Sequence, residues 1–98
     1  MIYIIATLSI KPGTFDQVMA LATPCIEATR KEDGCLSYDL HRSVNDENTL
    51  VFVERWRDMD AIKAHFVEPH LVAWRDGAEG LIADKKIEII TPEDVKVL

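Results

Sequence analysis

The order of extended and helical segments limits the possible folds of this chain more than any other feature of its sequence. Apolar, β-branched and alternating stretches predict strands over residues 2–10, 35–43, 50–56 and 86–90. Stretches with helical periodicity separate the first strand from the second and the third from the fourth. This strand-helix-strand-strand-helix-strand order is that of the ferredoxin-like arrangement. We therefore predict an α+β fold (βαββαβ) in which helices cover one face of a four-stranded sheet.

Local signals predict where the helices begin and end. Residues 14–17 have the form of a capping box at the start of the first helix. Gly34 is expected to close that helix in the left-handed conformation. Asp58 or Asp60 can cap a short second helix, and Pro69 is well placed as the first residue of another.

The length and charge of the chain exclude several classes of protein. Ninety-eight residues predict a single domain over residues 1–98. A formal net charge of −6 argues against binding to nucleic acid or to an anionic membrane surface. No apolar run is long enough to span a bilayer, and no signal peptide is visible. Cys25 and Cys35 are typical of a reduced cytoplasmic protein, although counting alone leaves a disulfide possible.

The face of the sheet that turns away from the helices is expected to be apolar. On the first and third strands the outward positions include Tyr3, Ile5, Val51 and Val53. Soluble monomers rarely expose such a patch. We therefore expect a homodimer in which two sheets pack face to face, forming a dimeric α+β barrel.

One carboxylate and one imidazole are expected to meet inside the molecule. Glu54 lies between Phe52 and Trp56 on an apolar strand face, where a carboxylate needs a partner or a raised pKa. His65 lies on the helical stripe that must pack on the sheet. We expect Glu54 to orient His65 so that the imidazole acts as a base. The alternative is a polar pair that only fixes the packing of helix on sheet.

Aromatic residues are expected to line a cavity near this pair. His70 lies four residues before Trp74, so the two share a helix face. Together with Tyr38, Phe52 and Trp56 they would enclose a planar, largely apolar ligand. Each of these residues alone could equally belong to an ordinary core.

No metal and no cofactor are expected. Glu54, His65 and His70 are a possible ligand set, but the histidines are five residues apart across a proline, unlike a helical zinc pair. No glycine-rich loop suited to phosphate binding is present. Neither Cys25 nor Cys35 has a sequence context typical of a nucleophile.

The chain resembles the antibiotic biosynthesis monooxygenase (ABM) domain family. The resemblance covers almost the whole chain and rests on an ordered set of segments: Lys11-Pro12-Gly13, Glu32 to Asp39, Glu54-Arg55-Trp56, Ala64-His65-Phe66 and Pro69-His70. It implies a dimeric barrel of ferredoxin-like subunits. Members of this family include cofactor-independent monooxygenases of quinols and anthrones, haem-degrading enzymes and an isomerase of a phosphorylated sugar. Trp74 stands where the haem-degrading branch has its haem-ligating histidine, which argues against that branch.

This resemblance implies a cofactor-free monooxygenase that oxidises a small electron-rich aromatic compound, such as a quinol, with dioxygen. His65 would be the base and Glu54 its orienting partner. The substrate would contact Tyr38, Phe52, Trp56, His70 and Trp74. Two alternatives stay open. One is an acid/base isomerase of a small (phospho)keto sugar, with Lys63, Arg75 or Lys85 as the anion-binding residue, and the other is a non-catalytic dimeric ligand-binding module.

Overall fold

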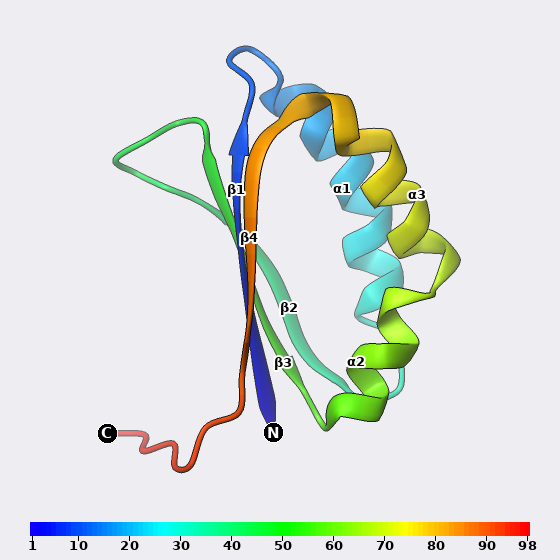
Figure 1. Ribbon diagram of the computed structural model, residues 1–98, viewed down its shortest axis with the longest axis vertical. Helices are drawn as coiled ribbons and strands as arrows, with labels where there is room; N and C mark the ends of the chain where they lie inside the picture. Colours follow the sequence, from blue (N-terminus) through cyan, green and yellow to red (C-terminus); the bar gives the residue numbers. More distant parts are fainter.

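The computed structural model describes residues 1–98. Its elements are β1 (Ile2–Ile10), α1 (Phe15–Thr29), β2 (Cys35–Arg42), β3 (Thr49–Trp56), α2 (Met59–Phe66), α3 (Pro69–Ala78), the 3-10 turn η1 (Glu79–Leu81) and β4 (Ile82–Ile90). The strands form one antiparallel sheet in the order β2-β3-β1-β4. All the helices cover the same face of this sheet (Figure 1). The predicted ferredoxin-like α+β fold is confirmed.

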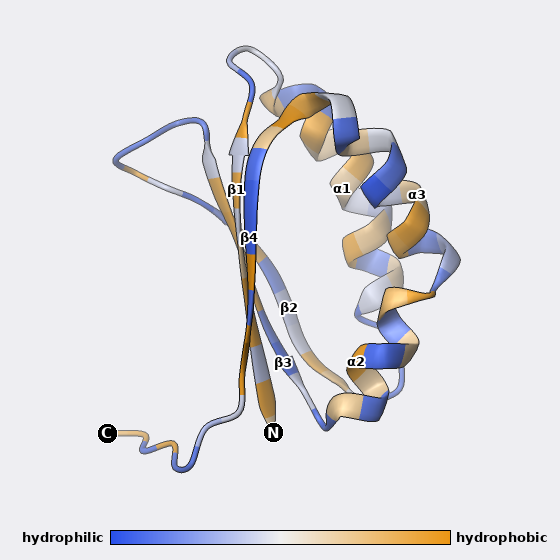
Figure 2. Ribbon diagram, viewed as in Figure 1, coloured by the Kyte–Doolittle hydropathy of each residue, from blue (hydrophilic) through white to orange (hydrophobic).

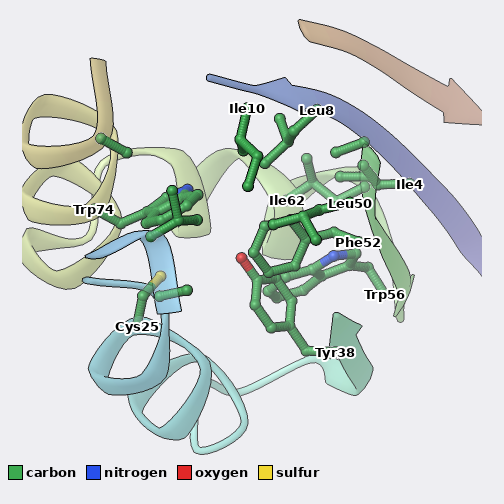
Figure 3. Close-up of a cluster of buried hydrophobic side chains, with 14 of the residues drawn as sticks. Ile4, Leu8, Ile10, Cys25, Tyr38, Leu50, Phe52, Trp56, Ile62 and Trp74 are labelled. Atoms are coloured by element: carbon green, nitrogen blue, oxygen red, sulfur yellow. The ribbon is translucent and has the colours of Figure 1, made fainter. Parts of the chain in front are cut away.

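Alternation along the two central strands decides which side chains meet the helices. Hydrophobic and hydrophilic residues alternate along the elements (Figure 2). The buried, helix-facing positions of β1 and β3 are Ile2, Ile4, Ala6, Leu8, Ile10, Leu50, Phe52, Glu54 and Trp56. Glu54 is the one charged residue in this set. Figure 3 shows aromatic rings from adjacent strands side by side in the core, with Trp74 facing them from α3.

The opposite face of the sheet has no helix over it (Figure 1). Tyr3, Ile5, Val51 and Val53 lie on this face and are only half-buried. Residues 91–98 leave the sheet on the same side, away from the helices (Figure 1). None of the helices is long and apolar enough to cross a membrane. The homodimer and the cytoplasmic location stay predictions.

Two helix ends agree with the sequence signals and two differ from them. The Asp58 carboxylate accepts a hydrogen bond from the backbone N–H of Ala61 at 2.8 Å, and Pro69 is the first residue of α3. Thr14 makes no side-chain cap, because its hydroxyl donates to a preceding backbone carbonyl instead. Gly34 has a φ of +88°, as expected, but lies in the turn before β2 rather than at the end of α1.

Two strands also differ from their predicted form. The register of β2 against β3 shifts between Cys35 and Ser37. Leu36, which simple alternation would place on the same face as the buried Tyr38, is therefore 57% exposed. The last strand begins at Ile82, earlier than the predicted 86–90, because β1 pairs with it along almost its whole length.

Candidate functional site

A cavity of about 590 Å³ lies between the sheet and the helices α2 and α3. Eleven of its 18 lining residues are hydrophobic, so it suits a largely apolar ligand. Of the site residues expected from the sequence, five line this cavity: Tyr38, Phe52, Glu54, His65 and Trp74. The aromatic rings among them form one continuous wall, with Tyr38 5.2 Å from Phe52 and Phe52 5.8 Å from Trp74 between ring centroids.

The exposed residues that line the cavity include charges of both signs. Arg75 and Lys85, suggested by the sequence as binders of an anion, line the cavity, whereas Lys63 does not. They are accompanied by three acidic residues, Asp76, Glu79 and Asp84. Two positive charges against three negative ones leave a balance of −1. This balance gives little support to a phosphorylated substrate.

His65 is hydrogen-bonded to Glu32 and not to Glu54. The Nδ1 atom of His65 lies 2.8 Å from Oε2 of Glu32. A carboxylate can only accept, so Nδ1 carries the proton and Nε2 keeps its lone pair. Nε2 has no hydrogen-bond partner within the chain. Every side-chain nitrogen or oxygen atom that is fully buried does have a partner, so Nε2 is not fully buried. Nε2 is therefore open to the cavity that His65 lines.

Glu54 has a different partner from the one expected. Its Oε1 accepts a hydrogen bond from the indole Nε1 of Trp56 at 2.9 Å. The two residues are two positions apart on the same face of β3, which brings the indole N–H within hydrogen-bond distance of the carboxylate. The ring of Trp56 in turn packs against His65, with 4.6 Å between centroids. Trp56 thus connects Glu54 to His65 and does not itself line the cavity.

Burial raises the pKa of Glu54 to about 7, and the charge of Glu32 adds to this effect, while the hydrogen bond from Trp56 opposes it. Only 5% of Glu54 is exposed. The expectation that a carboxylate at this position would need a partner or a raised pKa is confirmed, since it has both. Near neutral pH the side chain can therefore either donate or accept a proton.

Burial favours the neutral forms of His65, Tyr38 and the two cysteines. Burial lowers the pKa of His65, although its hydrogen bond to Glu32 opposes this. Burial also holds the pKa of the Tyr38 hydroxyl well above its usual range. Both thiols are free, and burial raises the pKa of Cys25 and brings that of Cys35 to about 11. Neither cysteine is a ready nucleophile, as the sequence indicated.

His70 lies on the far side of Glu32, outside the cavity where the sequence placed it. Its Nε2 atom lies 2.7 Å from Oε2 of Glu32, the same oxygen that binds His65. Because His70 follows the break at Pro69, its ring turns toward α1. It helps to line a second, more polar cavity of about 490 Å³, together with Pro24, Glu27, Ala28, Lys31, Glu32 and Glu68.

Glu32 is the site residue that the sequence reasoning missed. It lies in the turn between α1 and β2, where no helical or strand periodicity predicts the direction of a side chain. Its position inside the segment Glu32 to Asp39, one of those that carried the family resemblance, was the available signal. The donor atoms of Glu32, His65 and His70 all lie within 4.8 Å of one another, so these three could also hold a metal ion.

The turn that holds Glu32 depends on a close approach at Gly34. A Cβ atom added at Gly34 would lie 2.6 Å from the Cβ of Ala61 on α2, and the φ of +88° is strained for any other residue. Gly34→Ala is therefore expected to lower the free energy of unfolding by about 2–4 kcal/mol, measured in urea. The matched control is Gly13→Ala, with φ +79° but nothing within 4 Å, expected to cost about 1–2 kcal/mol. Equal losses in the two variants would contradict the contact with α2.

The fold and the site together define a small ferredoxin-like protein with a mainly apolar cavity, which is lined in part by an imidazole that a carboxylate holds in place. The sequence profile of the family described as "Antibiotic biosynthesis monooxygenase" (ABM) matches residues 1–77. The chain belongs to this family.

Individual relatives share the whole domain. The chain is 32% identical over 95 residues to "Putative monooxygenase YcnE" of Bacillus subtilis, which covers 97% of this chain and 93% of that protein. It is 35% identical over 92 residues to "Putative monooxygenase Rv0793" of Mycobacterium tuberculosis, covering 93% and 90%. "Probable quinol monooxygenase YgiN" of Escherichia coli is 24% identical, covering 94% and 98%. A longer uncharacterised relative from Synechocystis is matched over only 56% of its length.

The solved structure of Rv0793 superposes on this chain with a TM-score of 0.90 at 31% identity, covering 98% of both chains. A family member from Nitrosomonas europaea gives a TM-score of 0.91 at 22% identity, which bears on the fold alone. These likenesses agree with the ferredoxin-like fold described above.

Proposed function

We propose that this protein oxidises a small electron-rich aromatic compound of the quinol type with dioxygen, without a bound cofactor. The observation that carries the proposal is the oriented imidazole: Nδ1 of His65 is held by Glu32, and Nε2 is open to a mainly apolar cavity. A base in such a place can ionise a phenolic hydroxyl. The names of the relatives YcnE, Rv0793 and YgiN support oxygenase chemistry.

The reaction balances without a further reductant. Nε2 of His65 takes the proton of one phenolic hydroxyl, and the phenolate then passes an electron to dioxygen. The resulting radical and superoxide combine at a ring carbon to form a C–O bond. The peroxide takes up the proton held by His65, and its O–O bond breaks as water leaves and the ring carbon becomes a carbonyl. A quinol and dioxygen thus become a hydroxyquinone and water, with all the electrons supplied by the substrate.

The remaining cavity residues position the substrate in this proposal. The aromatic wall of Tyr38, Phe52 and Trp74 would pack against the ring. Glu54, with its pKa of about 7, would accept or donate the hydrogen bond of the second substrate oxygen. An apolar cavity also excludes water, which would otherwise compete for the phenolate.

The test is oxygen uptake by the purified protein with a panel of benzohydroquinones and naphthohydroquinones, corrected for uncatalysed autoxidation. The expected result is saturable uptake of one dioxygen per quinol, with hydroxyquinone as the product by mass spectrometry. Turnover of a keto sugar without oxygen uptake would favour the isomerase instead. Binding of quinols, seen as a thermal shift, without turnover would favour a ligand-binding module.

We further propose that the protein is a homodimer that buries the uncovered face of the sheet. Ile5 and Val53 are paired at the centre of this face, and Tyr3 and Val51 lie beside them. The C-terminal segment, residues 91–98, leaves the sheet on the same side (Figure 1), and it contains the exposed apolar residues Val95, Val97 and Leu98. A second copy would remove this apolar surface from water.

Val53→Glu is expected to convert the dimer into a monomer, because each subunit would then bury an unpaired carboxylate at the interface. Light scattering coupled to size exclusion measures the mass directly. Lys63→Glu, an exposed change on α2, is the control and should leave the dimer intact. A monomeric mass for the unmodified protein would refute the proposed assembly.

A further inference from the structure

We propose that Glu32, His65 and His70 form a binding site for one divalent transition-metal ion of the zinc class. The three side chains come from three separate elements: the turn after α1, helix α2 and helix α3. Oε2 of Glu32, Nδ1 of His65 and Nε2 of His70 lie within 4.8 Å of one another. Two imidazoles and one carboxylate are a donor set that zinc and its neighbours in the first transition row prefer.

The three ligands are already held in place by the fold. Only 2% of the His65 side chain, 9% of that of Glu32 and 20% of that of His70 is exposed. Both imidazoles meet one carboxylate oxygen, at 2.8 Å and 2.7 Å. The side chains have therefore lost most of their rotational freedom on folding, so binding an ion costs little further ordering.

The second cavity provides a route for a cation. Glu32 and His70 form part of its wall, and its charged residues are Glu27, Glu32, Glu68 and Lys31. Three carboxylates against one ammonium group leave a charge of −2 beside the ligands, which attracts cations. Water from this cavity can fill the remaining coordination positions. The Oε2 atom of Glu68 lies 3.9 Å from Nδ1 of His70, beyond hydrogen-bond distance, and it would have to move closer to accept a proton from this nitrogen when Nε2 binds the ion.

A metal ion would take the place of the two protons through which the imidazoles bind Glu32. In a tetrahedral zinc site the ligand atoms lie about 3.3 Å apart, so the 2.7–2.8 Å contacts must widen by about half an ångström. The two nitrogen atoms lie up to 4.8 Å apart and must approach by as much as about 1.5 Å, a movement that the partly exposed ring of His70 can make. Each imidazole would then present a lone pair to the ion and carry its proton on the other ring nitrogen.

Ion binding also changes the base of the proposed function, on which this effect depends. With the ion on Nδ1, the proton of the His65 ring stands on Nε2, the atom open to the larger cavity. Nε2 can then no longer accept the phenolic proton. A bound zinc ion would therefore switch the base off.

Titration calorimetry of the tag-free protein with Zn²⁺ alone tests the site. We expect one ion per subunit, and much weaker binding of Mg²⁺, which prefers oxygen ligands. Glu32→Gln and His70→Ala should each weaken the Kd by about tenfold or more. His41→Ala is the matched control, because His41 is exposed on β2, and it should keep the Kd within about twofold. An equal Kd in all four proteins, or no binding, would overturn the site.

Two further measurements separate loss of the site from unfolding and from binding at a thiol. Circular dichroism shows whether each variant is folded, and if Glu32→Gln is not, His70→Ala decides the result. The free thiol of Cys35 is a competing ligand, so Cys35→Ser should leave the Kd unchanged. The Co²⁺ complex should likewise lack the near-ultraviolet absorption of a thiolate ligand. Loss of binding in Cys35→Ser would overturn the proposal.

Zinc inhibition of oxygen uptake tests the consequence separately. The midpoint of inhibition should match the Kd from calorimetry, and a chelator should restore turnover. Full turnover with the site saturated would refute the switch. If no quinol is oxidised even without zinc, the proposed function fails, while the calorimetry still decides whether the ion binds.

Discussion

His65→Gln is expected to lower kcat for quinol oxidation by about 100-fold or more, because the variant lacks the imidazole whose Nε2 lone pair is open to the cavity. The glutamine amide can still donate to Glu32, so the fold should persist. Initial rates of oxygen uptake over a range of quinol concentrations separate kcat from KM. The KM should change little, since the aromatic wall stays intact.

Two companion variants sharpen this measurement. Glu32→Gln keeps the shape of the side chain, but its amide can donate to Nδ1 and so favours the tautomer with the proton on Nε2. It should lower kcat with KM nearly unchanged, as expected of a positioning residue. His41→Gln, on an exposed part of β2, should keep full activity. Unchanged turnover in His65→Gln would remove this imidazole from the mechanism.

Glu54→Gln is expected to stabilise the protein at alkaline pH. The pKa of Glu54 is about 7 in the folded protein, against an ordinary value of 4.5. Between these two values the unfolded chain releases the proton while the folded chain retains it, so folding stability falls as the pH rises. A difference of this size corresponds to about 3 kcal/mol, complete above pH 7 and absent below pH 4.5.

The measurement is the free energy of unfolding of both proteins in urea from about pH 4 to about pH 8, a range that spans both pKa values. The glutamine can still accept the hydrogen bond from Trp56, so the packing is preserved. The stability of Glu54→Gln relative to the unmodified protein should rise by about 3 kcal/mol across this range. Glu47→Gln, which changes an exposed carboxylate in the turn before β3, should show no such rise. Parallel stability curves for Glu54→Gln and the unmodified protein would contradict a raised pKa.

The order of the elements and the faces of the sheet were predictable because they depend on local periodicity. Alternation in residues 2–10 and 50–56 already separated a buried face from an outer one, and it put Glu54 on the buried face. The conformation of Gly34 and the cap at Asp58 were also readable, since each depends on a few neighbouring residues. The exposure of Leu36 was not predictable, because a register shift in β2 breaks the alternation.

The sequence by itself determined the fold and the residue types of the site. The order of the elements and the alternation of apolar residues decide which face of the sheet the helices must cover. Which carboxylate meets His65 was decided only by the tertiary structure. Glu32 lies 33 positions away in a turn without periodicity, and it reaches the imidazole because Gly34 lets that turn approach α2 closely. Glu54 is closer to His65 along the chain, but it accepts a hydrogen bond from Trp56 instead. Pairing over such a separation depends on how whole elements pack, which no local pattern records.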